Sequence, residues 1–213
     1  GTYRNMILDK DKVGFYVSPG KDAFLHREKW WKQGKPCEVA LVYGMDPLLY
    51  AVGSQSFPKN ISEYEYAGGI RGQGIDVIKG EATDLLLPAR AEIILEGVSY
   101  PGKTMMEGPF AEFAGYYARP GDETPYIEVK CVHHRNDPIL TIAPMSDHNS
   151  GNATMQCISR SAKIWDDLEA IGVPGIKGVF SHPMAVFGLV VVSIEQLYPG
   201  HSSQVAALAA QCT

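Results

Sequence analysis

Short runs of apolar and β-branched residues, separated by turn-forming residues, make up most of the chain. The first two runs, at residues 2–8 and 13–18, flank a polar stretch at residues 9–12 and predict a β-hairpin. Further strands are expected at residues 37–43, 75–80, 91–98, 126–133, 139–143, 176–180 and 186–194. Short strands at this spacing favour a barrel or a sandwich over a parallel sheet.

Apolar positions that recur every three to four residues predict helices between these strands. Helices are expected after Asp46-Pro47, from the N-cap Ser62, and at residues 23–32, 154–171 and 201–211. Gly34 and Gly172 lie where the first and the longest of them should end. We therefore expect an α+β fold that is mainly β, with residues 1–213 forming a single domain.

The bulk composition excludes several classes of protein. With 45% hydrophobic and 20% charged residues, the 213-residue chain is globular, and its net charge of -5 provides no basic field for nucleic acid. The longest apolar run, residues 186–192, is too short to span a bilayer. Four cysteines without a Cys-x-x-Cys pair fit a reducing cytoplasm. We expect a cytoplasmic protein that binds neither nucleic acid nor membrane.

Glu107 and Glu112 are the strongest candidates for chemistry. They lie five residues apart across Gly108-Pro109, a pair that forbids a continuing helix and predicts a kinked loop. With a cation between them, one carboxylate would stay ionised, while the other, buried against Phe110, would act as a general acid. The alternative is a pair of solvated loop glutamates, and the spacing alone leaves both interpretations open.

An ordered set of motifs then resembles the UbiD family of reversible aromatic and α,β-unsaturated acid decarboxylases. The motifs are Gly1-Thr2-Tyr3-Arg4, Ser18-Pro19-Gly20-Lys21, Ser62-Glu63-Tyr64, Ala67-Gly68-Gly69-Ile70-Arg71-Gly72, Leu87-Pro88-Ala89, the segments 91–97, 107–112 and 115–117, and His134-Arg135-Asn136-Asp137-Pro138-Ile139. They extend over almost the whole chain.

The resemblance implies a split β-barrel core that binds prenylated FMN, with flanking helices. Its catalytic network would be Arg4 between Glu107, the carboxylate paired with it, and Glu112, which delivers a proton to the decarboxylated carbon. An arginine stays charged, and its fork can hold one carboxylate ionised while it orients the other. The full-length protein is expected to be a homo-oligomer.

The resemblance also implies a manganese or magnesium ion and a potassium ion at the flavin phosphate. Glu63 matches the family's metal glutamate, and Asp22 stands at the position of its metal histidine, with His26 as a possible substitute. An asparagine ligand would lie just before Gly1. Without the resemblance, Glu63 would be a helix-start residue favoured by the helix dipole.

The other cofactor contacts come from three segments. Thr2, Tyr3 and Arg4 match a flavin-contacting stretch, Ser18, Gly20 and Lys21 match a segment suited to phosphate, and Gly53, Ser54 and Gln55 match further contacts. His133 and His134 either line the site or are ordinary strand-edge residues.

These residues lead to two functional hypotheses. The first is an enzyme for the non-oxidative decarboxylation of an aromatic acid, phenolic or aryl, or for the reverse carboxylation with carbon dioxide. The second is a flavin-binding core or assembly module without turnover, because family members are about twice as long. They carry an N-terminal region and a C-terminal oligomerisation domain that this chain is expected to lack, so the isolated core is expected to be inactive. A split-barrel flavin oxidoreductase would leave Glu107 and Glu112 unexplained.

Overall fold

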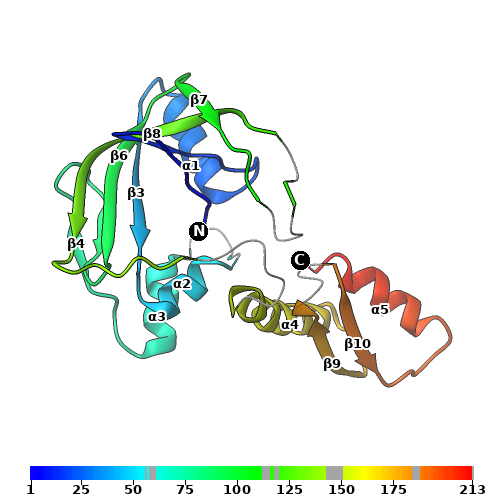
Figure 1. Cartoon of the computed structure of the whole chain (residues 1–213). Helices are drawn as coiled ribbons and strands as arrows, with labels where there is room; N and C mark the ends of the chain where they lie inside the picture. Colours follow the sequence, from blue (N-terminus) through cyan, green and yellow to red (C-terminus); the bar gives the residue numbers. More distant parts are fainter. Residues whose placement is uncertain are drawn as a thin grey trace. The chain divides into compact units, whose positions relative to one another are not determined.

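A computed structural model of the chain describes residues 1–55, 57, 61–111, 116–117, 120–142, 151–183 and 188–212 (Figure 1). The chain divides into two compact units. The first holds Gly1–Phe110 and Tyr117–Ile142, and the second holds Ala111–Tyr116 and Ala143–Thr213. The sequence predicts one domain over residues 1–213, whereas the last third of the chain folds on a core of its own.

An antiparallel sheet forms the centre of the first unit, where six of the described strands pair in the order β1-β2-β8-β6-β3, with β7 also paired to β8. The strands are β1 (Ile7–Asp9), β2 (Lys12–Gly14), β3 (Cys37–Tyr43), β6 (Ile93–Ser99), β7 (Thr104–Glu107) and β8 (Asp122–His134). The long strand β8 pairs with β7 at its start and with β2 and β6 further along. It therefore connects the end that carries Glu107 to the end that carries His133.

Helix α1 (Asp22–Trp31) contacts β3 of this sheet and is fixed by a buried arginine. The Arg27 guanidinium lies within 5.5 Å of the ring centroids of Phe15, Phe24 and Trp31 and donates to the Phe15 carbonyl at 3.1 Å. These cation–π contacts and the hydrogen bond offset the loss of water around the charge. They hold the start of α1, where Asp22 lies, at a defined place against the sheet.

Helices α2 (Pro47–Gly53) and α3 (Glu63–Arg71) pack on each other around Leu49, Val52 and Ala67. Both begin as the sequence predicts: the Asp46 carboxylate accepts the Leu48 N–H at 2.9 Å, and the Ser62 hydroxyl accepts the Tyr64 N–H at 3.3 Å.

Helix α3 passes through Gly68 and Gly69 and ends at Gly72, whose φ of +70° is the left-handed conformation of a helix C-terminus. Strands β4 (Val77–Lys79) and β5 (Leu86–Pro88) form a separate hairpin.

The second unit packs two helices against a two-stranded sheet. Its elements are α4 (Gly151–Ile171), β9 (Ile176–Ser181), β10 (Val190–Ile194) and α5 (His201–Ala209). Ile164 and Leu168 of α4 are fully buried, and Val205 of α5 joins the same core. Apolar positions of both helices therefore face this core, whereas Ile158 of α4 is 67% exposed.

The expected mixed fold, mostly sheet, is confirmed, and some of its details differ. The pairing path of the described strands ends at β1 and β3 without closing. The strand expected over residues 139–143 is wrong for residues 139–142, and residue 143 lies outside the described part. In that same part, no helix is long and apolar enough to cross a bilayer.

Candidate active site

Glu107 is the last residue of β7 and is only 1% exposed, so the expectation that it lies in a loop is wrong. Its Oε2 accepts a hydrogen bond of 2.7 Å from the hydroxyl of Thr124, which is buried on the neighbouring strand β8. A Cβ at Gly14 would overlap the Glu107 carboxylate, so the absence of a side chain there makes room for it. A solvated loop glutamate is thereby excluded for Glu107.

The N-terminal segment brings Arg4 to the stretch that follows Glu107. The guanidinium of Arg4 lies 4.8 Å from the centroid of the Phe110 ring, and Met6 Sδ accepts the Gly108 N–H at 3.5 Å. A guanidinium over an aromatic ring at this distance makes a cation–π contact. Residues about 100 positions apart in the sequence are thus neighbours. Glu112 lies outside the described residues.

Tyr3 links the N-terminal segment to the start of α1 and to the proposed metal residues. Its hydroxyl oxygen accepts the Ala23 N–H at 3.3 Å. Burial raises the pKa of Tyr3, and the negative charges of Asp22 and Glu63 add to this. Asp22 and Glu63 therefore act on the same hydroxyl, while Thr2 beside it is exposed.

The segment Ser18 to Lys21 forms a turn directly before α1. The Lys21 N–H donates to the Ser18 carbonyl at 3.3 Å, and Gly20 has a φ of +86°, which favours glycine. Lys21 is the N-cap of α1, but its side chain makes no capping hydrogen bond. Backbone N–H groups at such a helix start suit a phosphate.

Ser54 and Gln55 end helix α2 and bond locally. The Ser54 hydroxyl donates to the Ala51 carbonyl at 2.7 Å, and Gln55 Nε2 donates to Ser54 Oγ at 3.1 Å. Gly53, the last residue of the helix, has open space where a side chain would project.

The proposed metal residues both begin helices. The Glu63 side chain is 39% exposed, and its Oε1 lies 3.3 Å from the α-amino group of Gly1. Asp22 and His26 are exposed on α1. Among the described residues, the three-residue group whose ligand atoms converge consists of Glu96, Cys131 and His133, which includes neither Asp22 nor Glu63.

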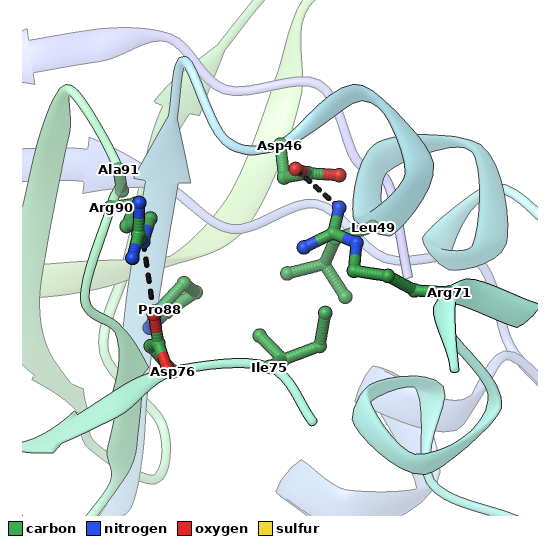
Figure 2. A pocket seen from close by; sticks show the side chains of 8 residues that line it. All are labelled: Asp46, Leu49, Arg71, Ile75, Asp76, Pro88, Arg90 and Ala91. Atoms are coloured by element: carbon green, nitrogen blue, oxygen red, sulfur yellow. Dashed lines mark hydrogen bonds and ion pairs between the residues drawn. The ribbon is translucent and has the colours of Figure 1, made fainter. Parts of the chain in front are cut away.

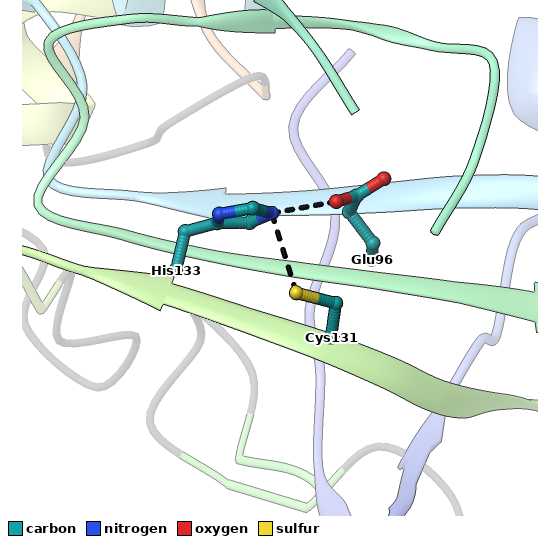
Figure 3. Close-up of side chains that lie close together, drawn as sticks. All are labelled: Glu96, Cys131 and His133. Carbon is teal, nitrogen blue, oxygen red and sulfur yellow. Dashed lines mark hydrogen bonds and ion pairs between the residues drawn. The ribbon is translucent and has the colours of Figure 1, made fainter. Parts of the chain in front are cut away.

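His133 and His134 point to different partners. Nε2 of His133 lies 2.6 Å from Oε1 of the fully buried Glu96 and 3.5 Å from Sγ of Cys131 (Figure 3). His134 is exposed, and its Nδ1 lies 2.8 Å from the Arg135 carbonyl oxygen.

A small pocket lies between the start of α2, at Asp46, and the end of α3, at Arg71, and it is too small for a flavin or an aromatic acid. Its volume is about 30 Å³, which is room for about one water molecule. Its two arginines are already ion-paired, Arg71 with Asp46 and Arg90 with Asp76 at 2.9 Å (Figure 2). Neither a flavin nor an aromatic acid fits there.

Comparison with known proteins gives the family. The family model for the 3-octaprenyl-4-hydroxybenzoate carboxy-lyase Rift-related domain, UbiD, matches residues 1–147. The chain belongs to the UbiD family. Residues 153–213 match the family model for the 3-octaprenyl-4-hydroxybenzoate carboxy-lyase C-terminal domain. The boundary between the two matches agrees with the two compact units.

Individual UbiD relatives agree with this membership. The chain is 35% identical over 213 residues to an uncharacterized protein of Aquifex aeolicus, a match that covers 97% of this chain and 42% of that one. It is 36% identical over 140 residues to the phenolic acid decarboxylase of Bacillus subtilis, which covers 66% of this chain and 29% of the relative. The chain thus spans less than half the length of these relatives.

A solved UbiD-class structure has the same fold. HmfF from Pelotomaculum thermopropionicum, in complex with FMN, superimposes with a TM-score of 0.88 at 28% identity, over 98% of this chain and 46% of HmfF. An evolved dimeric form of HmfF, in complex with prFMN, gives the same TM-score and identity and covers 48% of that chain.

Two residues at the candidate site are missing from the sequence-based set of site residues. Thr124 holds the Glu107 carboxylate, and Gly14 leaves space for it. Gly14 interrupts a β-prone run, and a glycine within a strand often marks a close approach of another group. Thr124 carries no such signal, because a threonine in a strand is ordinary.

Proposed function

We propose that this chain is the cofactor-binding part of a carboxy-lyase that removes carbon dioxide from an aromatic acid, or adds it, with prenylated FMN. The observation that carries the proposal is the buried Glu107 at the end of β7, with the Arg4 segment beside it. Burying a carboxylate costs free energy unless it is hydrogen-bonded or paired, and buried titratable groups of this kind gather at functional sites. The UbiD-class relatives that decarboxylate phenolic acids support this reaction class.

The catalytic network of the proposal is Arg4, Glu107 and Glu112. When bound, prenylated FMN supplies an electrophilic ring that accepts the electrons of the breaking bond to the carboxylate carbon. Arg4 holds Glu107 ionised and orients it. Glu112 gives a proton to the carbon that has lost carbon dioxide, and it is reprotonated from solvent.

The cofactor would be bound by the start of the chain and two neighbouring turns. Thr2, Tyr3 and Arg4 would contact the flavin, as would Ser54 and Gln55. Ser18, Gly20 and Lys21 would bind its phosphate, because backbone N–H groups and a lysine suit an anion.

The metal would lie at the same phosphate. Glu63 with Asp22, or with His26 in place of Asp22, would hold manganese or magnesium there, since hard cations prefer oxygen ligands. A potassium ion would share the phosphate. The influence of both Asp22 and Glu63 on Tyr3 supports this grouping.

We also propose a barrel architecture, an oligomeric state and a cellular location for the full-length protein. The strands would form the split barrel of UbiD-class enzymes, and the full-length protein would be a cytoplasmic homo-oligomer with further regions beyond these 213 residues. The dimeric HmfF supports the oligomer.

Carbon exchange tests the function directly. The chain, alone and within a longer protein that supplies the flanking regions, is loaded with prenylated FMN and manganese and given hydroxybenzoates with ¹³C-bicarbonate. We expect label in the carboxyl group with prenylated FMN and none with plain FMN, and only in the longer protein. Flavin binding without exchange in either form would favour the module hypothesis.

The proton-donor role has its own comparison. Glu112→Gln should abolish exchange, while Glu123→Gln, a change at an exposed position of β8, should leave it within about twofold. Robust exchange in Glu112→Gln would remove Glu112 from the mechanism.

A further inference from the structure

We infer that Glu96, Cys131 and His133 form a second metal site, selective for zinc and similar borderline-soft cations. This site is independent of the proposed flavin chemistry. The three ligand atoms lie within 4.8 Å of one another, with Nε2 of His133 aimed at both of the others (Figure 3).

The strand register explains why these three side chains meet. Glu96 of β6 pairs directly with Cys131 of β8, and His133 follows two residues later. Side chains two residues apart in a strand share one face of the sheet, and a directly opposite residue shares it too. The backbone pairing therefore places the three side chains together on one face of the sheet.

The two distances that involve His133 can be compared with those of a tetrahedral zinc site. With ordinary zinc bond lengths, a sulfur and a nitrogen ligand lie about 3.6 Å apart, and a nitrogen and an oxygen ligand about 3.3 Å. The structure has 3.5 Å between Cys131 Sγ and His133 Nε2, and 2.6 Å between His133 Nε2 and Glu96 Oε1. The second distance is a hydrogen bond, so a cation would replace the shared proton as the imidazole moves back by about 0.7 Å.

Hydrogen bonds from a neighbouring loop hold the Glu96 carboxylate in place as a metal ligand. Glu96 Oε1 accepts the Glu81 N–H at 2.9 Å, and Oε2 accepts the Thr83 N–H at 3.0 Å and the Thr83 hydroxyl at 2.5 Å. Outer hydrogen bonds of this kind orient the ligands of metal sites.

The thiol and the imidazole are reachable from solvent. The His133 side chain is 21% exposed, and Cys131 is partly exposed, whereas Cys37, Cys157 and Cys212 are buried. A water molecule can therefore complete the coordination as a fourth ligand, as in zinc sites with three protein ligands.

The donor set decides which cation fits. A thiolate and an imidazole favour zinc, and cobalt as its spectroscopic substitute, over magnesium or manganese. Burial and the charges of Glu81 and Glu96 raise the pKa of Cys131, so the free thiol keeps its proton at neutral pH. Metal binding must release that proton to the buffer.

Cobalt absorption and zinc competition test the site in the 213-residue chain. We expect one cobalt ion per chain with a thiolate-to-cobalt band, displaced by zinc but not by magnesium, and a proton released on zinc binding. Cys131→Ser should abolish the band. His133→Asn should weaken zinc binding by at least roughly 100-fold, because loss of an outer partner alone costs about 10–100-fold.

Matched controls separate this site from incidental binding. His134→Asn alters the adjacent histidine, and Cys212→Ser alters a buried thiol, and both should leave zinc binding unchanged. Thermal unfolding without metal should show that Cys131→Ser and His133→Asn remain folded. Absence of the thiolate band in the parent chain would overturn the inference, as would zinc affinity that survives both variants.

Discussion

Two glutamates are buried in the same sheet, and they are held in different ways. Glu96 is fully buried within β6, and its carboxylate accepts hydrogen bonds from the backbone and hydroxyl of the loop at Thr83. Glu107 is 1% exposed at the end of β7, bonded to the Thr124 hydroxyl and beside the Arg4 segment. Burial and a threonine hydroxyl donor are common to both carboxylates, whereas Glu96 is also bonded by backbone N–H groups and by His133.

The two carboxylates differ in the groups that donate hydrogen bonds to them. Burial raises the pKa of Glu96, but the hydrogen bonds from the Thr83 hydroxyl, from His133 and from the backbone N–H groups of the loop outweigh it and lower the pKa to about 2. The same hydrogen bonds fix the loop to the sheet. At Glu107, the Thr124 hydroxyl donates to Oε2, and the missing side chain of Gly14 leaves room for the carboxylate. We therefore expect Glu96 to control stability and Glu107 to control activity.

The largest expected effect on stability is that of Glu96→Gln. The amide has the same shape, but its NH₂ group would face the loop donors at residues 81–83. Urea unfolding should show a loss of about 3 kcal/mol in the free energy of unfolding, as when a buried charge loses its partners. The matched change Glu123→Gln, at an exposed position, should alter it by less than about 0.5 kcal/mol.

Acid should remove the same contribution in the parent chain. The pKa of Glu96 falls from 4.5 to about 2 on folding, so its stabilisation is complete above pH 4.5 and is lost as the pH falls towards 2. That shift corresponds to about 3 kcal/mol. Unfolding free energies measured across this window should converge for the parent and Glu96→Gln, and parallel curves would contradict the assignment.

Gly14→Ala tests the space beside Glu107. The added Cβ would overlap the carboxylate, so β2 or Glu107 must shift, and we expect a loss of about 2 kcal/mol in stability and reduced exchange. Gly178 is a strand glycine whose Cβ would meet nothing within 4 Å. Gly178→Ala should be nearly neutral, and equal losses in the two variants would point to a general cost of the alanine.

The smallest effect is expected from Thr124→Val, which removes only the hydroxyl that Glu107 accepts. We expect a loss of about 1 kcal/mol in stability and a drop of roughly tenfold in exchange, mostly restored by Thr124→Ser. Thr104→Val, at an exposed position of β7, is the control. If the serine variant is as impaired as the valine variant, the hydroxyl is not what matters.

Local signals predict much of this fold. The N-caps Asp46 and Ser62 begin helices as expected, and strand β3 covers residues 37–43 as the apolar run indicates. Strand β7 is not among the strands expected from the sequence. Its four residues, Thr104–Glu107, are too few to show an alternation of apolar and polar residues, and Gly108-Pro109 follows directly. Its pairing with β8 is a long-range contact, which no local pattern contains.

The sequence predicts some residues of the candidate site but not the contacts that hold them. The motif order names Arg4 and Glu107, and the fold brings their segments together. Glu96 lies in a matching segment too, yet its role as the anchor of a loop depends on Gly80, where a Cβ would overlap its carboxylate, and on donors 13 or more residues away. These hydrogen bonds depend on how the loop between β4 and β5 packs on β6, which no local spacing in the sequence predicts.

The most direct test measures both properties in both variants, Glu96→Gln and Glu107→Gln, in the longer protein with prenylated FMN. Glu96→Gln should lose about 3 kcal/mol of stability while its folded fraction keeps exchange within about threefold. Glu107→Gln should keep stability within about 1 kcal/mol and lose exchange by roughly 1,000-fold or more. Exchange that survives Glu107→Gln, or fails in folded Glu96→Gln, would contradict this division of roles.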